Sequence, residues 1–594
     1  MFRTNTCGEL RLADAGRQVT LAGWVQRVRK MGGMTFVDIR DRYGITQLVF
    51  NNEIDPALNE AANHLGREFV IQVKGVVAER TSKNPNMPTG DIEILASELN
   101  ILNPSEVPPF TIEDESDGGD DIRMRYRYLD LRRTPVRRNL ELRHRMTMEV
   151  RRYLDSKGFL EIETPMLVGS TPEGARDFVV PSRMNQGQFY ALPQSPQQYK
   201  QLLMLSGFDR YFQIARCFRD EDLRADRQPE FTQIDLEMSF LNEDEIMTIQ
   251  EGFLKRVFKE VLDVDIQTPF QRMPWREAMD RFGSDKPDLR FGFELKDISD
   301  IVKDCGFGVF SGPVANGGSV RLINIEGGAA AFPRKKIDKL GDFAKTYRAK
   351  GLAWARLHEG NMTSSYAKFL TEEENRAILD RAGAKDGDLV LIVGDEKNTV
   401  VWAALGALRC EIAKQMGLLD PKDFRFLWVT EFPMFEWSEE ENRYMAMHHP
   451  FTAPMVEDED KILTDKANCR ARAYDIVLNG TELGGGSIRI NTPEMQEKAF
   501  QALGISEEDI QERFGHLVNA FKFGAPPHGG LAYGLDRLCM LMAGAPSIRD
   551  VIAFPKVQNA SDLMMACPDV VDDKQLDDLS IAVTRMEETS EEGE

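Results

Sequence analysis

Residues 214–240 combine the alternation of a β-hairpin with charge at positions where a hairpin normally buries apolar side chains. Two strands are expected, from about 214 to 221 and from about 230 to 240, joined by a charged loop. Alternate residues of a strand share one face, which groups Phe231, Gln233, Asp235 and Glu237. A solvated surface hairpin is the simple alternative. So many polar and charged side chains beside one phenylalanine instead favour a binding site.

Composition excludes several classes of protein. The 594 residues suggest about four domains. No apolar run approaches the roughly 20 residues that cross a bilayer, and the first ten residues lack the apolar core of a signal peptide. The seven cysteines form no CxxC pair, which disfavours disulfides and a zinc site and fits the cytoplasm. Because the net charge is −22, any contact with RNA must use local basic patches.

The first 103 residues are rich in strand patterns. A short helix between the third and fourth of five strands is typical of the OB-fold, a barrel that binds oligonucleotides. Strand alternation places Phe36 on the outer face near Gln47, with Arg29 just upstream, which suits single-stranded RNA. The pattern alone is equally compatible with Phe36 in the core. The expected strands are 19–25, 34–40, 45–50, 68–77 and 91–102, and the expected helix is 55–66.

The next part of the chain carries helical signals. Residues 103–121 are rich in proline, glycine and acidic residues, which is typical of a linker. A strand is expected at 159–167, ended by a proline. At 189–204 a helix is expected with Ser195 as its N-cap and Pro196 at its first position, which places Lys200 one turn later. A long amphipathic helix is indicated by apolar residues at helical spacing: Leu142, Met146, Val150 and Leu154.

The charged hairpin resembles a known motif. Its FRDE (218–221) and RQPEFTQID (227–235) are similar to motif 2 of class II aminoacyl-tRNA synthetases, in the form found in the bacterial aspartyl group. The long helix and strand of 125–167 resemble motif 1, and PPHGGLAYGLDRLCMLM (526–542) resembles motif 3. The resemblance extends over nearly the whole chain.

The resemblance implies an α+β fold: an N-terminal OB-fold barrel, and a catalytic domain with an antiparallel sheet and an inserted GAD-type α+β domain. We assign no chemistry to the insertion. The expected boundaries are 1–103 for the anticodon-binding barrel, 104–124 for the linker, 125–290 and 424–560 for the two catalytic parts, 291–423 for the insertion, and 561–594 for a C-terminal extension with an acidic tail.

The resemblance also implies an ATP site. An arginine fork fits phosphate oxygens, so Arg219 and Arg537 are the expected catalytic residues. The ring of Phe231 offers a face for adenine, while Asp475 and Glu482 offer oxygen ligands for Mg²⁺. Asp536 is expected to fix Arg537 or the start of its helix. The expected ATP-binding residues are Arg219, Asp220, Glu221, Gln228, Phe231, Glu482, Gly534, Leu535, Asp536 and Arg537.

The amino-acid substrate implied is L-aspartate. Lys200 and Arg489 would hold its side-chain carboxylate, and asparagine would leave both cations unpaired at a cost of about a few kcal/mol. Asp235 would bind the ammonium group. Glu482 and Arg489 lie seven residues apart, so a bend or bulge in the glycine run between them must intervene if both reach one site. The expected aspartate-binding residues are Glu173, Gln197, Lys200, Asp235, His448 and Arg489.

The implied RNA partner is tRNA(Asp), and the implied assembly is a homodimer. The barrel would read the anticodon through Arg29, Phe36 and Gln47. Some relatives also charge tRNA(Asn), and the loop before the second strand is where the two kinds differ. Here it carries Met31, a leucine-like side chain without a ring nitrogen, which favours an enzyme that charges only tRNA(Asp). Alternatively, Met31 fills a gap in the barrel wall, and other loop residues, such as Lys83 and Asn84, decide which tRNA is charged.

Two other functions remain as alternatives. The first is a ligase of the same fold for another amino acid, although Lys200 and Arg489 would repel lysine. The second is a non-catalytic paralogue that only binds RNA. Such chains usually lose motif residues, whereas Arg219, Glu221, Glu482, Arg489 and Arg537 are all present here.

Overall fold

The computed structural model describes residues 1–170, 175–223 and 226–584. Glu173 and the acidic tail from residue 587 onward therefore lie outside the described residues. The chain divides into two compact units, one of residues 1–141 with 549–570, the other of residues 142–548 with the C-terminal segment. No helix within the described ranges is both long and apolar enough to cross a membrane.

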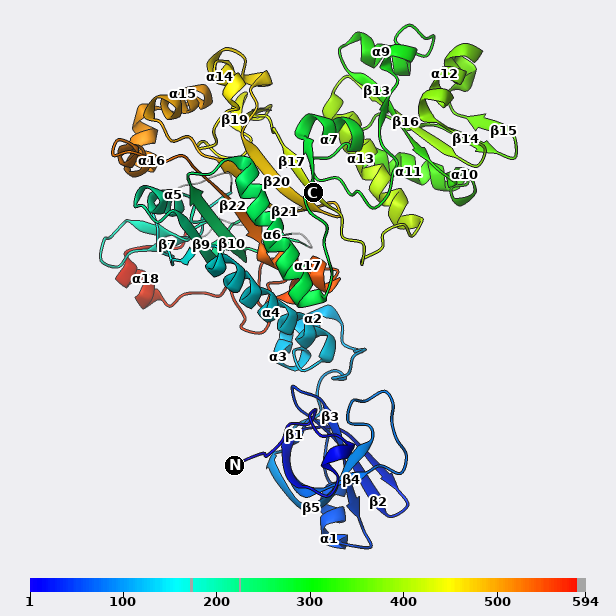
Figure 1. The fold of residues 1–594 in the computed structure, drawn as a ribbon, viewed down its shortest axis with the longest axis vertical. Coiled ribbons are helices and arrows are strands. Elements are labelled where there is room, and N and C mark those ends of the chain that lie inside the picture. Colours follow the sequence, from blue (N-terminus) through cyan, green and yellow to red (C-terminus); the bar gives the residue numbers. More distant parts are fainter. Residues whose placement is uncertain (171–174, 224–225, 585–594) are drawn as a thin grey trace, which may run out of the picture. The chain divides into compact units, whose positions relative to one another are not determined.

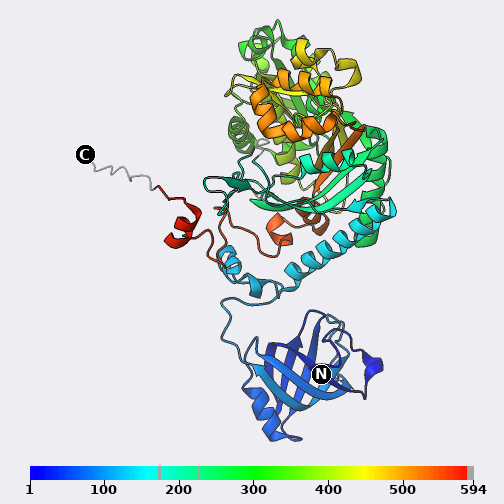
Figure 2. The same ribbon diagram turned by 90° about the vertical axis from the view of Figure 1, so that its left-hand side faces the viewer.

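The first unit contains a closed five-stranded barrel, with the strand order β1–β2–β3–β5–β4 (Figure 2). Inward-facing Val37, Ile39 and Leu48 are completely buried. Every strand begins within two residues of its expected start, and the helix lies where it was predicted. The OB-fold prediction is therefore confirmed. The elements are β1 (Gln18–Met31), β2 (Met34–Arg40), β3 (Ile45–Asn51), α1 (Pro56–Asn63), β4 (Val70–Glu79) and β5 (Ile92–Asn103).

The second unit is built on an eight-stranded sheet in the order β11–β17–β20–β21–β22–β10–β9–β6 (Figure 1). Its pairs are antiparallel except at the two ends, where β11 pairs with β17 and β6 with β9 in parallel. The antiparallel catalytic sheet predicted from the sequence is therefore confirmed. Its strands are β6 (Leu160–Glu161), β9 (Arg210–Phe218), β10 (Glu230–Ser239), β11 (Gln271–Pro274), β17 (Phe426–Thr430), β20 (Ala473–Leu478), β21 (Thr481–Ile488) and β22 (His528–Gly534).

Long helices cover this sheet. Helix α6 (Glu243–Leu262) packs on β22, where Phe253 and Tyr533 place their ring centroids 5.1 Å apart. Helix α4 (Thr134–Ser156) contacts α6, and the Tyr153 hydroxyl donates to the carbonyl of Ile249 at 2.8 Å. The predicted amphipathic helix is confirmed, because all four residues at helical spacing are buried: Leu142, Met146, Val150 and Leu154.

Several boundaries differ from expectation, and three of them are described here. Strand β9 ends at Phe218, because the next peptides turn away to pair with other segments: the amide of Asp220 donates to the carbonyl of Arg176. Strand β6 keeps only two residues of the predicted 159–167. Helix α5 (Gln197–Leu205) begins one residue late, with Pro196 as N-cap and no capping side chain within the described chain, so the N-cap prediction for Ser195 is wrong.

A second, smaller sheet lies within the second unit. It has the order β12–β13–β16–β14–β15 and is antiparallel throughout. Apolar clusters pack on both of its faces, one including Ile323, Leu391 and Leu405, the other Val320, Ile392 and Ile378. Its elements are β12 (Lys296–Asp297), α8 (Ser299–Val302), α9 (Gly308–Ala315), β13 (Ser319–Ile325), α10 (Gly328–Ala331), α11 (Arg334–Thr346), β14 (Ala353–His358), β15 (Asn361–Ser364), α12 (Glu372–Ala382), β16 (Leu389–Asp395) and α13 (Asn398–Gln415).

The barrel core makes a stability prediction. Replacing Ile39, which is 0% exposed, with alanine should lower the local free energy of unfolding by about 2–5 kcal/mol, because it leaves a cavity. Hydrogen–deuterium exchange of the barrel strands in the full chain measures this. Ile54→Ala is the matched control, since Ile54 is 81% exposed in the same barrel. Equal exchange rates in the two variants would contradict the assigned core.

Candidate active site

A cavity of about 570 Å³ opens in the second unit above the middle strands of the large sheet. Its walls come from β10, β20, β21 and β22, from the start of α5, and from the start of α17 (Leu535–Ala543). Residues predicted from separate parts of the sequence therefore share one site. The predicted residues that line it are Gln197, Lys200, Arg219, Glu221, Gln228, Phe231, Asp235, His448, Asp475, Glu482, Arg489, Gly534, Asp536 and Arg537.

Three predicted site residues are not among those that line the cavity. Asp220 is half exposed and pairs with Arg176 at 3.6 Å. Leu535 is buried at the start of α17. Glu173 lies outside the described residues.

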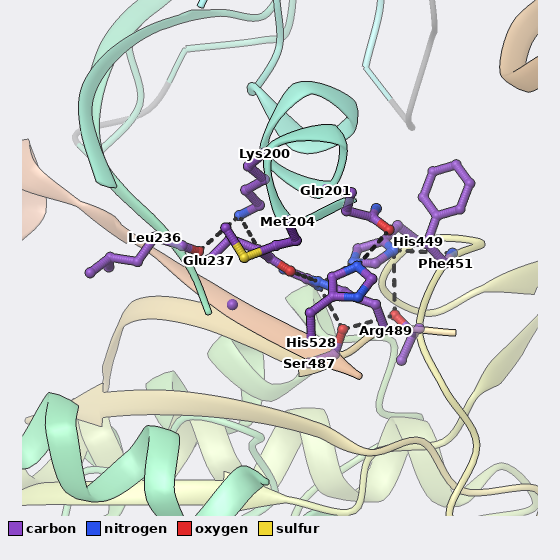
Figure 3. Close-up of polar contacts among 12 residues, drawn as sticks. Lys200, Gln201, Met204, Leu236, Glu237, His449, Phe451, Ser487, Arg489 and His528 are labelled. Carbon is purple, nitrogen blue, oxygen red and sulfur yellow. Dashed lines mark hydrogen bonds and ion pairs between the residues drawn. The ribbon is translucent and has the colours of Figure 1, made fainter. Parts of the chain in front are cut away.

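The floor of the cavity rests on a buried cluster of two cations and two carboxylates, of which Figure 3 labels Lys200, Glu237 and Arg489. Lys200 Nζ lies 2.7 Å from Asp235 Oδ1 and 3.4 Å from Glu237 Oε2. On the other side of Glu237, Arg489 donates from Nε to Oε1 at 2.9 Å and from Nη2 to Oε2 at 3.1 Å. None of the four residues is more than 3% exposed. Glu237 therefore holds both cations in place.

The backbone makes room for this cluster. A Cβ atom on Gly530 of β22 would lie 1.8 Å from Glu237 Oε2, so only glycine fits beside that carboxylate. Gly485 plays a similar part for Asp475, whose Oδ1 would lie 2.5 Å from an added Cβ. The glycines of 484–486 do line the cavity, yet much of the space they leave is taken by neighbouring strands and by Asp475.

Burial and charge shift the acidity of the cluster in opposite directions. Burial raises the pKa of the Asp235 carboxyl, although Lys200 opposes that rise. Burial alone would also raise the pKa of Glu237, but the charges of Arg489 and Lys200 outweigh it and hold that pKa below its ordinary value. Asp235 Oδ2 has no hydrogen-bond partner in the part of the chain that the structure describes. This oxygen remains available for a cationic group of a ligand.

The two adjacent histidines have different surroundings. His449 Nε2 lies 2.6 Å from Arg489 Nη1, and burial together with the Arg489 charge holds its pKa well below the ordinary value. A neutral His449 therefore accepts a hydrogen bond from Arg489. His448 Nε2 instead lies 3.6 Å from Asp475 Oδ1. Burial opposes its charge, but Asp475 and Glu482 raise its pKa overall.

Asp475 and Glu482 lie on neighbouring strands at the other end of the cavity. Burial and the charge of Asp475 raise the pKa of the Glu482 carboxyl. Asp475 Oδ1 is buried without a hydrogen-bond partner among the described residues. Two crowded carboxylates fit a divalent cation, which would remove their repulsion. The donor set suits Mg²⁺, which takes one or two carboxylates together with phosphate oxygens and water.

A bulge brings Glu482 and Arg489 to one site, as predicted. Ile476 pairs with Gly484 while Val477 pairs with Glu482, so Leu483 is the extra residue. The bulge therefore precedes the glycine run, and its predicted position within that run is wrong. Because one added residue reverses the alternation, Glu482 and Arg489 both reach the cavity.

The arginines predicted to bind phosphates flank the cavity. The Arg219 guanidinium lies 5.1 Å from the centre of the Phe231 ring. Arg537 pairs with Asp226 at 3.2 Å. Of the two roles predicted for Asp536, the contacts fit the fixing of the helix start: its carboxylate accepts hydrogen bonds from the Thr232 amide at 2.8 Å and from Arg143 at 2.5 Å. It thereby ties α17 to β10 and α4.

On the barrel, the three predicted RNA-reading residues form one group. Arg29 donates to Asp38 at 2.9 Å and to Gln47 at 3.0 Å, and Gln47 donates to Glu93 at 2.8 Å. Phe36 pairs across the strands with Arg29 and is half-buried outside the barrel core. The alternative that placed Phe36 in the core is therefore wrong.

The loop before β2 is a tight turn. Gly32 and Gly33 have φ values of 55° and 81°, which glycine adopts readily. Met31 at its start is 66% exposed. It does not fill a gap in the barrel wall, and that alternative is also wrong.

Several residues that build the site were not predicted from the sequence. Strand alternation places Glu237 on the same face of β10 as Asp235, two residues earlier, and this pattern could have identified Glu237 as a site residue. His449 and Ser487 contact Arg489 from other segments, with Ser487 Oγ 2.7 Å from Nη1. Only the folded chain brings these groups together.

Comparisons with known proteins agree with this geometry. The family of tRNA synthetases class II (D, K and N) matches residues 119–558, and the OB-fold nucleic acid binding domain matches residues 19–102. The aspartate–tRNA ligase of Phocaeicola vulgatus is 61% identical, covering 98% of this chain and 99% of that protein. The aspartate–tRNA ligase of Ruminiclostridium cellulolyticum is 58% identical, covering 98% of both.

Solved structures share the fold at lower identity. Asparaginyl-tRNA synthetase from Pyrococcus horikoshii, complexed with asparaginyl-adenylate, is 19% identical with a TM-score of 0.59, covering 93% of this chain and 98% of that one. Aspartyl-tRNA synthetase from Entamoeba histolytica is 20% identical with a TM-score of 0.57, covering 92% of this chain and 90% of that one. With the motif residues around one cavity and the family match spanning most of its length, this chain belongs to the class II tRNA synthetases of the D, K and N group.

Proposed function

We propose that this chain is an aspartate–tRNA ligase. The carboxylate of L-aspartate attacks the α-phosphorus of ATP, pyrophosphate leaves, and a ribose hydroxyl at the 3′ end of tRNA(Asp) then takes the aspartyl group. The observation that carries the proposal is the buried pair Lys200 and Arg489 at the floor of the cavity. The near full-length relatives named aspartate–tRNA ligase support the same substrate.

The cluster geometry supports selection of aspartate within the D, K and N group. The side-chain carboxylate of the substrate would approach Lys200 and Arg489, while Asp235 Oδ2 would receive its ammonium group. Lysine would bring a third cation to this cluster. Asparagine would supply a neutral amide whose NH₂ faces the donors of Arg489, leaving them unpaired at about a few kcal/mol. We assign further contacts to Gln197, His448 and, outside the described residues, Glu173.

ATP would occupy the other end of the cavity. Arg219 and Arg537 would stabilise charge on the phosphates, and Phe231 would stack on adenine after the Arg219 side chain moves towards the phosphates. Asp475 and Glu482 would hold Mg²⁺, which when bound neutralises phosphate charge. These residues position the reactants, so we invoke no general base from the protein.

The main rival is a paralogue that binds RNA without catalysis. The full set of charged side chains around the cavity favours the enzyme, because an inactive paralogue has no use for so costly a buried cluster. Aspartate-dependent exchange of pyrophosphate into ATP separates the two. No exchange at saturating aspartate and Mg²⁺ would contradict the proposed function.

We further propose a homodimer in the cytoplasm. Large apolar side chains are exposed near the sheet edge formed by β6, including Leu160 at 52% and Leu167 at 51%. A second copy would cover them. The seven cysteines are all free thiols, in keeping with a reducing compartment. We keep the domain boundaries expected from the sequence, with the barrel as the anticodon-binding part.

The assignment of Arg489 is tested by substitution. Arg489→Leu should reduce aspartate-dependent exchange by at least a hundredfold while the Kd for ATP changes little, because Arg489 contacts only the amino-acid end of the site. Arg443→Leu is the control, since Arg443 lies on an exposed hairpin. An Arg489→Leu exchange rate within tenfold of the parent at saturating aspartate would show that the assignment is wrong.

Removal of residues 1–110 tests the division of labour. The truncated chain should still form aspartyl-adenylate, because every cavity residue lies beyond that point. Charging of tRNA(Asp) should fall severely, because the anticodon contact is lost. Pyrophosphate exchange and aminoacylation on the same folded preparation give the two readouts, and an equal loss in both would count against this division.

Choice between tRNA(Asp) and tRNA(Asn) is assigned to the loop with Met31. We expect kcat/KM for tRNA(Asn) to be far below that for tRNA(Asp), and Met31→His to raise the ratio, since imidazole can hydrogen-bond a base. Met34→His is the matched control, because Met34 faces Met31 across the same turn. Comparable charging of both tRNAs by the parent enzyme would refute strict selection.

A further inference from the structure

Residues 283–292, here called the junction segment, connect helix α7 (Trp275–Phe282) to the smaller sheet. The segment runs past the ATP end of the cavity. Asp285 lines that end together with Glu482 and Arg537. The neighbouring Lys286 lies 3.6 Å from Asp285 and leaves 49% of its side chain exposed.

The junction segment packs on the hairpin that carries the two cation-binding carboxylates. At the turn between β20 and β21, a Cβ on Gly480 would lie 3.2 Å from the Cβ of Asp288. Lys286 lies beside Asp285, which lines the cavity together with Glu482 of this hairpin. A flexible cation therefore stands at the mouth of the ATP end.

Helix α13 anchors the far end of the segment. Arg409, which is 1% exposed, donates from Nη2 to three backbone carbonyls: Asp288 at 3.1 Å, Phe291 at 3.3 Å and Gly292 at 2.8 Å. Its guanidinium also lies 4.4 Å from the Phe291 ring centre. One buried side chain of the inserted part thus fixes the course of this loop.

The near end is fixed by contact between two glycines. A Cβ on Gly406 of α13 would lie 2.5 Å from the carbonyl oxygen of Gly283. Gly283 has a φ of 65°, and a Cβ there would lie 2.3 Å from the carbonyl oxygen of Trp402. Both ends of the junction segment are therefore held by the same helix, with Lys286 between them.

We propose that Lys286 binds the β- and γ-phosphates of ATP and the departing pyrophosphate, and that helix α13 positions it for this contact. This inference rests on the proposed function and deepens it. In the activation step an oxygen of the aspartate carboxylate bonds to the α-phosphorus, and the bond from that phosphorus to the bridging oxygen breaks. The electron pair leaves with pyrophosphate, and no proton moves. Lys286 stabilises the charge that accumulates on the leaving group.

Charge balance at this end supports the proposal. Asp226, Asp285, Asp475 and Glu482 all line the cavity near the place of the phosphates, an unfavourable field for an anion. A lysine ammonium is a compact charge on a flexible stem, so it can exchange Asp285 for a phosphate oxygen. Lys286 would then act with Arg219 and Arg537. The inserted part thereby gains a role in the reaction: it holds a phosphate ligand.

The test is steady-state pyrophosphate exchange with Lys286→Ala. We expect KM for ATP and for pyrophosphate to rise about tenfold or more, and KM for aspartate to stay within twofold. Lys286→Arg should restore most of the loss, since it keeps the charge. Lys339→Ala is the matched control, an exposed lysine on α11 of the same inserted part. Values for Lys286→Ala within twofold of the parent for both phosphate substrates would overturn the proposal.

The positioning role is tested through Arg409. Arg409→Lys keeps the buried charge but cannot reach all three carbonyls, and it should raise the same two KM values. Combined with Lys286→Ala, Arg409→Lys should cause no further rise in either KM, because both changes remove the same contact between Lys286 and the phosphates. Additive effects would overturn the role of α13.

Calorimetric binding of MgATP and of pyrophosphate separates this inference from the proposed function. If the parent chain shows no aspartate-dependent exchange but Lys286→Ala still weakens pyrophosphate binding, only the proposed ligase function is contradicted. An active parent with unchanged binding in Lys286→Ala would contradict only the role of Lys286.

Discussion

The constraint on which the active site depends is the burial of two cations against two carboxylates. Lys200, Asp235, Glu237 and Arg489 come from α5, β10 and the end of β21, and water reaches almost none of them. An unpaired charge in such a place would cost several kcal/mol. The three elements must therefore keep one exact register, since a slip of one residue on β10 would turn both carboxylates to the opposite face. The proposed recognition of the substrate and the assembly of the sheet would therefore rely on the same contacts.

The two ends of the cavity differ in how their charge is balanced. At the floor, Glu237 already neutralises much of Lys200 and Arg489, and a zwitterionic ligand can enter without a large net change. At the ATP end, Asp475 and Glu482 repel one another, and burial strengthens that repulsion. A polyanion can be accommodated there only with added positive charge. The site is thus complete for the amino acid and incomplete for the nucleotide, which fits a nucleotide that arrives with its own cation.

Much of the fold could be predicted because its signals are local. The barrel strands follow from alternation and turns, and Leu142 to Leu154 follow from helical spacing. The bulge between Glu482 and Arg489 followed from counting residues, although its position at Leu483 did not. Short elements were harder: β6 pairs through two residues only, and no pattern marks so brief a strand. Most site residues came from the family resemblance. Glu237 and His449 were missed because their importance lies in contacts between distant segments.

Gly530 has a consequence for how this family could change its substrate. The carboxylate of Glu237 occupies the space where any other residue at position 530 would place its Cβ atom. Neither position can be substituted alone. A larger residue at 530 would displace the Glu237 carboxylate, and loss of that carboxylate would leave two buried cations unpaired and a cavity beside the glycine. A change of amino-acid substrate, by evolution or by directed selection, therefore requires simultaneous substitutions on two strands. A library that varies single codons would fail to find such a switch, whereas one that couples positions 237 and 530 could.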